Sequence, residues 1–188
     1  MAQSHPPMYG DATFAGPPGN HGAQRYRYLL WRSWEPRDEQ LTFILCNPSH
    51  AGGLKHGRLT SDSTVDRLVE IAQARGAGGF TLVNLVAHIE PDLAKAGRIG
   101  LEGPDNRRYL EFALGLAGTL VVGWGARPQF RAQSRWLLER LGKRPLFCVG
   151  INPGPPRTPM HPLQRGPKRL RLEPFLTTAF SESRPSKD

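Results

Sequence analysis

The stretch Thr42-Phe43-Ile44-Leu45-Cys46-Asn47-Pro48-Ser49 runs from unbroken apolar residues into a polar turn. An apolar run of this length is typical of a strand buried on both faces. Pro48 has no amide hydrogen and keeps Asn47 extended, so the strand should stop there. We therefore expect the Asn47 side chain to project from the carboxyl end of a central strand, where open α/β sheets bind their ligands.

Strand-like and helix-like segments alternate on both sides of this stretch. Apolar or aromatic runs predict strands at 26–34, 41–46, 80–88, 119–125 and 146–150, and an edge strand at 170–172. Helical spacing of apolar residues predicts helices at 64–75, 104–116 and 129–141, the first capped by Asp62 or Ser63. This order indicates a three-layer αβα sandwich with a mostly parallel central sheet of about four strands. We expect the 26–34 strand to be an antiparallel edge, joined to 41–46 through the polar turn at 35–40.

The two ends of the chain differ in composition from its middle. Residues 1–24 are rich in proline, glycine and small polar residues, which predicts a disordered arm. Residues 179–188 are polar and predict a disordered tail. A single α/β domain over residues 25–178 remains, long enough to bury a core.

Composition excludes several classes of protein. The hydrophobic content is 38% and the mean hydropathy is −0.45, with no apolar run as long as a membrane span. The first residues lack the basic and apolar regions of a signal peptide. We therefore expect a cytoplasmic, monomeric protein without a membrane partner. Cys46 and Cys148 both lie in apolar runs and should be reduced, buried thiols.

The chain is strongly basic, with a net charge of +9 and a pI near 10.2. Such a charge predicts a polyanionic partner, nucleic acid first, although an arginine-rich composition without a specific partner gives the same number. Its placement favours the partner, because basic residues crowd the proline-rich loop at 151–168 and follow Trp124. The residues expected to contact DNA are Arg127, Arg131, Arg157, Arg165, Lys168, Arg169 and Arg171.

Four features should meet at the carboxyl ends of the strands: Asn47, Asn84, Trp124 and His161. Asn84 lies in an apolar strand, where an amide is costly unless its hydrogen bonds are met. The hydrogen-bond partner of the Asn84 amide is either the backbone of a neighbouring loop or the planar edge of a base. Asn47 either orients a water molecule or forms a turn with its own backbone. Trp124 is either a core residue or a stacking platform, and His161 is either a site residue or simply solvated.

A metal or cofactor site is not expected. His50, His56 and Asp62 are close in the sequence, but their spacing matches no familiar ligand pattern. The glycine cluster at 76–79 precedes a strand, which is the wrong context for a phosphate-binding loop. The sequence contains no Walker loop, no G-x-S-x-G and no H-E-x-x-H.

The order of these motifs closely resembles an uncharacterised bacterial and phage family of unknown function. That family shows L-N-P-S-T-A, D-P-T-[IV]-x-R, G-x-G-G-F, N-L, G-P-x-N, W-G and H-P-L in this order. The matching segments here, within about residues 25–175, are 45–51, 62–67, 76–80, 84–85, 103–106, 124–125 and 161–163. The chain departs from the pattern at His50, where the family prefers threonine, and in a longer loop at 50–61.

More distantly, the same order resembles the uracil-DNA glycosylase superfamily. The resemblance implies that Asn47 positions a water molecule, that Asn84 reads the base and that His161 stabilises the departing base. We expect Pro48, Ser49, Asn84, Trp124 and Gly125 to bind the substrate. Leu163 stands where that superfamily has a serine, and no acidic residue stands at position 47.

We therefore expect a uracil-DNA glycosylase-like fold that recognises a base in DNA, rather than RNA, and hydrolyses its N-glycosidic bond without a cofactor. Two alternatives remain open. One is a nucleic-acid-binding module with the same fold and no chemistry. The other is an enzyme that acts on free nucleosides or nucleotides.

Overall fold

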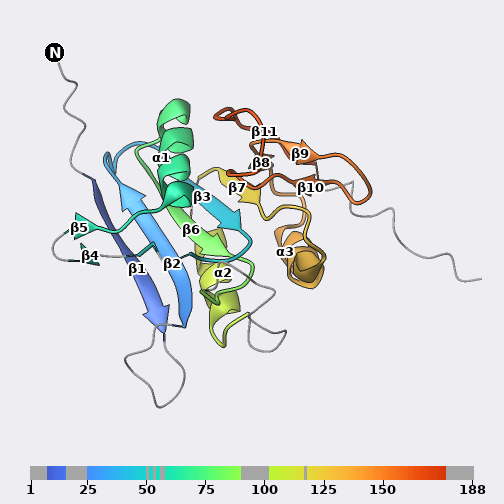
Figure 1. Ribbon diagram of the computed structural model, residues 1–188, viewed down its shortest axis with the longest axis horizontal. Coiled ribbons are helices and arrows are strands. Elements are labelled where there is room, and N and C mark those ends of the chain that lie inside the picture. The colour runs from blue at the N-terminus through green and yellow to red at the C-terminus, as the bar shows by residue number, and fades with distance from the viewer. Residues whose placement is uncertain are drawn as a thin grey trace, which may run out of the picture.

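The computed structural model describes residues 8–15, 25–49, 51–52, 54–55, 58–89, 102–116 and 118–176. A seven-stranded mixed sheet forms the centre, in the order β1-β2-β6-β3-β7-β8-β11 (Figure 1). Its strands are β1 Tyr9–Ala15, β2 Tyr26–Ser33, β3 Gln40–Leu45, β6 Gly79–Asn84, β7 Leu120–Gly123, β8 Leu146–Cys148 and β11 Glu173–Pro174. Two short hairpins lie outside it: β4 Leu54–Lys55 with β5 Arg58–Leu59, and β9 Ile151–Asn152 with β10 Thr158–Pro159.

Four adjacent strands, β6, β3, β7 and β8, run parallel. The strand β3 lies between β6 and β7, and its last residue, Leu45, pairs with Asn84 of β6 on one side and Gly123 of β7 on the other. These two pairings bury β3 completely from Leu41 to Leu45, as an uninterrupted apolar run predicts. The four-stranded parallel core is therefore confirmed.

Three helices occur in the described part of the chain: α1 Ser63–Arg75, α2 Asn106–Gly115 and α3 Arg131–Leu141, with a 3₁₀ turn, η1 Pro128–Phe130, before α3. The predicted cap of α1 is confirmed, because Asp62 Oδ1 accepts hydrogen bonds from the amides of Thr64 and Val65 at 2.9 Å. Gly76 ends that helix in the left-handed conformation, with φ of 77°.

The helices cover both faces of the sheet. Phe43 and Leu45 of β3 pack in one core with Leu68 of α1. Ile44 packs in a second core with residues of α2 and α3, among them Leu110 and Leu137. Alternate residues of one strand thus face opposite layers, which makes the architecture a three-layer α/β sandwich.

The antiparallel part of the sheet differs from expectation in three places. Residues 9–15 form β1, paired with β2, where a disordered arm was predicted from composition. The strand β2 pairs with β6 rather than with β3, because the amides of Trp34 and Glu35 bond to the carbonyl of Gly78 and carry the chain past the start of β6. The C-terminal edge strand pairs with β8 at 173–174, not at 170–172. The predicted tail at 179–188 and most of the predicted arm lie outside the described residues.

The direction of the chain across the sheet reverses next to β3. From β3 it passes over α1 to β6 on one side, and from β6 it passes over α2 to β7 on the other side. The loops that leave β3 and β7 therefore diverge to opposite faces. In open α/β sheets this switch point is where a ligand-binding crevice forms.

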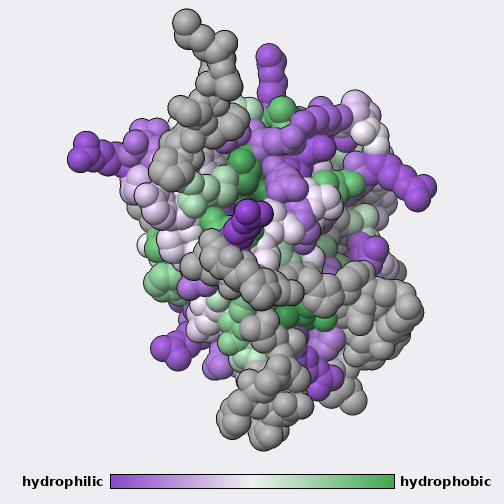
Figure 2. All heavy atoms as spheres, turned by 60° about the vertical axis from the view of Figure 1, so that its left-hand side comes forward, coloured by the Kyte–Doolittle hydropathy of each residue, from purple (hydrophilic) through white to green (hydrophobic). Residues whose placement is uncertain are grey.

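Figure 2 shows the face of the molecule on the side of β1, where hydrophilic side chains predominate and hydrophobic ones form small scattered patches. Tyr9 of β1 is 60% exposed, and Trp31 of β2 is 37% exposed. None of the helices in the described ranges combines the length and apolar composition needed to cross a membrane.

Candidate functional site at the carboxyl ends of the central strands

The segment that carries His161 is held against the end of β7. The amide of Gly125 donates to the carbonyl of Pro159 at 2.9 Å, and the amide of Met160 donates to the carbonyl of Gly150 at 2.8 Å. Gly123 has no room for a side chain, because a Cβ atom there would lie 2.9 Å from Leu45 Cδ2 and 3.1 Å from the Met160 carbonyl oxygen. This close approach brings His161 to the same edge of the sheet as Asn47.

His161 is a neutral imidazole near pH 7. The pKa of His161 is lowered to about 4, first by burial and then by the positive charge of Arg127, while Asp62 partly opposes both. Its Nδ1 atom accepts a hydrogen bond from the amide of Leu163 at 3.2 Å. The ring proton of a neutral imidazole must then be on Nε2, so His161 offers one hydrogen-bond donor.

Asn84 is the last residue of β6 and is 2% exposed. Its Oδ1 atom accepts from Arg27 Nη2 at 3.3 Å, whereas its Nδ2 atom has no partner among the described residues. The Asn84 backbone is supported separately, since Asn106 Nδ2 donates to the carbonyls of Asn84 and Leu85 at 3.0 and 2.9 Å. The amide is thus fixed from one side and unmatched on the other.

Two arginines of β2 lie buried under the loop that follows β3. Arg27 donates to the carbonyl of Ala51 at 2.8 Å and to that of Ser49 at 3.4 Å. Arg32 donates to the carbonyl of Thr60 at 2.8 Å and to that of Gly52 at 2.5 Å. Desolvation lowers the pKa of Arg27 to about 10, with Asp62 opposing the shift.

Asp62 joins the turn after β3 to α1. The Ser49 hydroxyl donates to Asp62 Oδ2, while Asp62 Oδ1 caps the helix. Asn47 Nδ2 lies 3.4 Å from the carbonyl oxygen of Pro48, a long and weak bond. Both oxygens of the Asp62 carboxylate are therefore already engaged, and the Asn47 amide is only loosely held by this contact.

Sequence reasoning missed Arg27, Arg32 and Asp62 as members of this cluster. The signal for the arginines was present, because both interrupt an otherwise apolar and aromatic strand. The strand pattern alone does not say which strand end a buried guanidinium will reach. Asp62 was identified only as a helix cap and as a rejected metal ligand.

The Trp124 side chain is almost fully buried. Its side chain is 2% exposed and packs edge to face on Phe175, so it belongs to the core. Gly125 and Trp124 border a hollow of about 140 Å³ whose wall includes Arg127 and Arg131. The structure therefore brings Asn47, Asn84 and His161 to one edge and directs the Trp124 indole inward.

The predicted DNA-contacting residues fall into two groups. Arg165, Lys168 and Arg169 line a hollow of about 200 Å³ together with His161 and with Arg67 of α1. A second, wider hollow of about 510 Å³ adjoins it and is lined by Lys168, Arg169 and Arg171.

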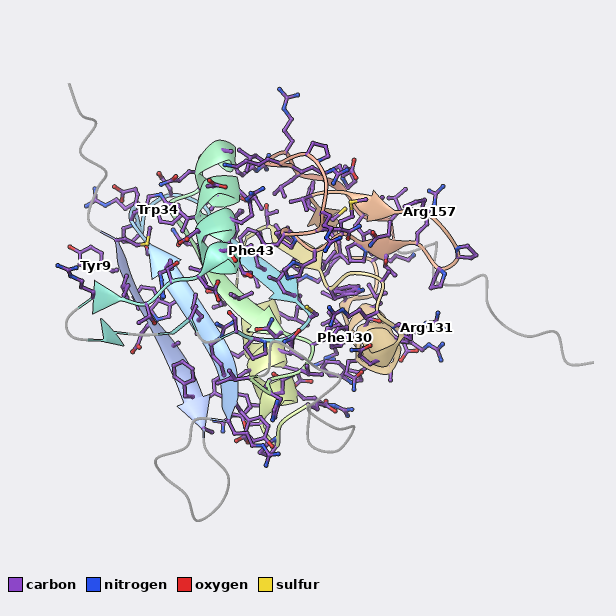
Figure 3. All side chains as sticks on the ribbon, viewed as in Figure 1. Tyr9, Trp34, Phe43, Phe130, Arg131 and Arg157 are labelled. Atoms are coloured by element: carbon purple, nitrogen blue, oxygen red, sulfur yellow. The ribbon has the colours of Figure 1, made fainter. Side chains whose placement is uncertain are left out.

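The other group lies toward α3. Arg131 at the start of α3 and Arg157 in the β9–β10 hairpin are on the side of the molecule opposite Tyr9 of β1 (Figure 3).

Within the first group, the charge of Lys168 is partly neutralised, since its Nζ atom lies 2.6 Å from Glu70 Oε1.

No group of three or more potential metal ligands occurs among the described residues. His50 and His56 lie outside them. Cys148 is buried, and burial raises its pKa to about 11. The pKa of Cys46 is also raised by burial. Both groups are thiols at neutral pH. The expected burial is confirmed for Cys148, whereas Cys46 is only partly buried.

Residues 27–163 match the model of a family described as "Protein of unknown function (DUF1643)". The chain belongs to this family. The match begins at Arg27 and includes Asn47, Asn84 and His161. Neither the curated proteins nor the solved structures gave a match. The membership agrees with the resemblance to an uncharacterised family and assigns no activity.

Proposed function

We propose that the protein recognises a base in DNA and hydrolyses its N-glycosidic bond. The observation that carries the proposal is His161, a neutral imidazole with a single donor, Nε2–H, fixed at the carboxyl end of the central strands. A fixed donor stabilises negative charge as it develops on a leaving group. The resemblance of the motif order to uracil-DNA glycosylases supports the same assignment.

The reaction requires a base flipped out of the duplex. The bond between the sugar C1′ atom and the base nitrogen breaks, and the electron pair leaves with the base. His161 Nε2–H donates to an oxygen of the departing base. A water molecule held by Asn47 adds to C1′ and loses a proton to solvent, from which the base is then protonated. Asn47 cannot itself take the proton, because an amide does not titrate in this range.

The basic side chains around His161 support a polyanionic substrate. Arg67, Arg165, Lys168 and Arg169 line the same hollow as His161, and phosphates flanking a flipped nucleotide would pass there. The hydrolysis as written needs no metal or redox cofactor.

A binding module without chemistry is the second candidate, and Asp62 favours it. Asp62 is the carboxylate that interacts electrostatically with His161, but both of its oxygens are engaged by Ser49 and by the first turn of α1. It is therefore not available to activate water. Turnover should be slow at best when only an amide orients the nucleophile.

One assay separates these functions. Duplexes that each carry one different damaged or modified base are incubated with excess protein, and abasic sites are scored by alkaline strand cleavage. Abasic sites in one or more duplexes support the glycosylase. Selective duplex binding without abasic sites supports the binding module. Weak duplex binding with release of base from free nucleosides would replace both by a nucleoside hydrolase.

A further inference from the structure

The hollow of about 140 Å³ beside Trp124 lies where the loop after β7, the start of α3 and the β9–β10 hairpin meet. Its lining residues come from the segments 124–127, 130–134 and 152–158 and include two arginines, Arg127 and Arg131, but no aspartate or glutamate. Neither arginine forms an ion pair with a described residue. The hollow therefore carries two uncompensated positive charges.

The indole of Trp124 adds a hydrogen-bond donor without a partner to the wall of this hollow. Trp124 is 2% exposed, and its Nε1 atom bonds to no described residue. The ring packs on Phe175, so its N–H edge and not its face is left for a ligand. An indole N–H can only donate, and buried donors in native proteins are almost always paired. An unmatched donor on the wall of a positively charged hollow points to an anionic ligand.

The β9–β10 hairpin supplies a second donor, the hydroxyl group of Thr158, which is also buried on the wall of the hollow. Gln164 Nε2 donates to Asn152 Oδ1 at 2.5 Å, so the other end of the Asn152 amide faces Thr158. Asn152 Nδ2 then donates to Thr158 Oγ1 at 3.0 Å. Because the Thr158 oxygen already accepts this bond, its proton is left to donate, and it has no acceptor among the described residues.

We propose that this hollow binds a phosphate monoester, the terminal phosphate of a nucleotide or of a nucleic-acid strand. A monoester carries nearly two negative charges at pH 7 and three acceptor oxygens. Its charge matches Arg127 and Arg131, and its oxygens match their guanidinium groups, the Trp124 indole and the Thr158 hydroxyl. A phosphodiester inside a strand carries one charge and would balance only one of the two arginines. The inference goes beyond the proposed function, because base removal has no part in it.

The first test observes the Trp124 indole directly, by nitrogen–proton NMR spectroscopy of the full chain. Inorganic phosphate is added at constant ionic strength. The Trp124 indole signal should shift and saturate, because its N–H gains an acceptor, whereas the signal of Trp31 in β2 should stay in place. A Trp124 signal that does not move, or that moves in proportion to phosphate without saturating, would overturn the inference.

The second test separates a strand end from a free nucleotide. Single strands of one sequence carry an internal fluorophore and a phosphate at the 5′ end, at the 3′ end or at neither. Fluorescence anisotropy at one salt concentration should give about tenfold or more tighter binding of at least one phosphorylated strand. Deoxynucleoside monophosphates are added as competitors, with the nucleosides as controls. Competition by the monophosphates at the affinity of the phosphorylated strand would identify a free nucleotide as the ligand, and weaker competition would identify the strand end.

Variants assign the preference for a terminal phosphate to the hollow. Arg131→Gln and Thr158→Val should each bring the ratio between the phosphorylated and the unphosphorylated ligand within about threefold, because each removes one charged or buried donor. Thr158→Ser keeps the hydroxyl and should keep most of the ratio. Arg135→Gln is the matched control: Arg135 is exposed on the same helix, carries the same charge and does not line the hollow. It should leave the ratio unchanged.

Equal affinities for phosphorylated and unphosphorylated ligands would overturn the inference and leave the two arginines as contacts to the strand backbone. An equal loss of the ratio in Arg135→Gln and Arg131→Gln would also overturn it, by showing that binding senses only net charge. A preference for the terminal phosphate without abasic sites in the damage panel would support the inference and count against the hydrolytic function alone.

Discussion

Replacing His161 by glutamine should flatten the acid limb of the stability curve. The folded-state pKa of His161 is about 4, against an ordinary value near 6.5. Each pKa unit corresponds to about 1.4 kcal/mol, so the difference is worth about 3 kcal/mol. This contribution is fully present above pH 6.5, where both states are neutral. It is lost as the pH falls toward 4, because the unfolded chain binds the proton first.

The assay is urea unfolding of the wild type and of His161→Gln between pH 7 and pH 4. The wild type should lose about 3 kcal/mol more free energy of unfolding than the variant over this interval. Other acidic groups titrate in both proteins and cancel in the difference. Equal m-values are the control that the two unfolding transitions are comparable. Parallel pH profiles, or a His161 ring that titrates near pH 6.5 in NMR spectra, would refute the assignment of His161 as a neutral imidazole with a lowered pKa.

Three further predictions test the surroundings of His161. Gly123→Ala should destabilise the fold by about 1–3 kcal/mol through overpacking and should move the pKa of His161 toward 6.5, measured by unfolding and by NMR titration. Gly115→Ala is its control; a Cβ there meets no atom within 4 Å, and an equal loss of stability would remove the packing argument. Asp62→Ala should cost about 1 kcal/mol in thermal unfolding because the α1 cap is removed, and an unchanged Tm would contradict it. The third change neutralises three basic side chains near His161 together: Lys168, Arg169 and Arg171. It should weaken duplex binding and reduce the slope of log affinity against log salt concentration by about one for each phosphate that is no longer bound. The control neutralises three basic side chains toward the amino ends of the parallel strands: Arg37, Arg75 and Lys143. It should change neither the duplex affinity nor its salt slope. Equal effects of the two sets would mean that binding senses only net charge.

The parallel core could be predicted from the sequence because its signals are local. The apolar run ending at Pro48 identified β3, and the spacing from Asp62 to Gly76 identified α1 with both of its ends. An amide inside an apolar run identified Asn84, although the strand ends at this residue and not at 88 as predicted. Each of these features depends on neighbouring residues of the chain, which a single sequence displays.

The antiparallel edge could not be predicted in the same way, because it depends on contacts between distant segments. Proline and glycine on both sides of β1 hid a strand that pairs with β2 over seven residues. The polar turn at 35–40 is compatible with a hairpin, and only the insertion of β6 between β2 and β3 excludes one. At the C-terminal edge, β11 pairs with β8 over only two residues, too few to leave a pattern.

Only part of the candidate site could be predicted, because some of its residues are placed by contacts between distant segments. Asn47 and His161 follow strand ends, and the switch point brings them to one edge. Trp124 was expected to face a ligand, but the residue after a short strand can as easily turn into the core, and Phe175 provides its partner there. Arg27 was missed because the sequence shows a charged residue in a strand without showing that it is buried.

The most direct test of the central claim is single-turnover cleavage of the best duplex in the damage panel by the wild type and three site variants. The account predicts abasic sites with the wild type and rates about 100- to 1,000-fold lower for Asn47→Ala and His161→Gln, with duplex affinity retained. Asn47→Asp should cleave at least as fast as the wild type, because a carboxylate can activate the water. Wild-type cleavage rates in both Asn47→Ala and His161→Gln, or no abasic site in any duplex, would contradict the glycosylase function and favour the binding module instead.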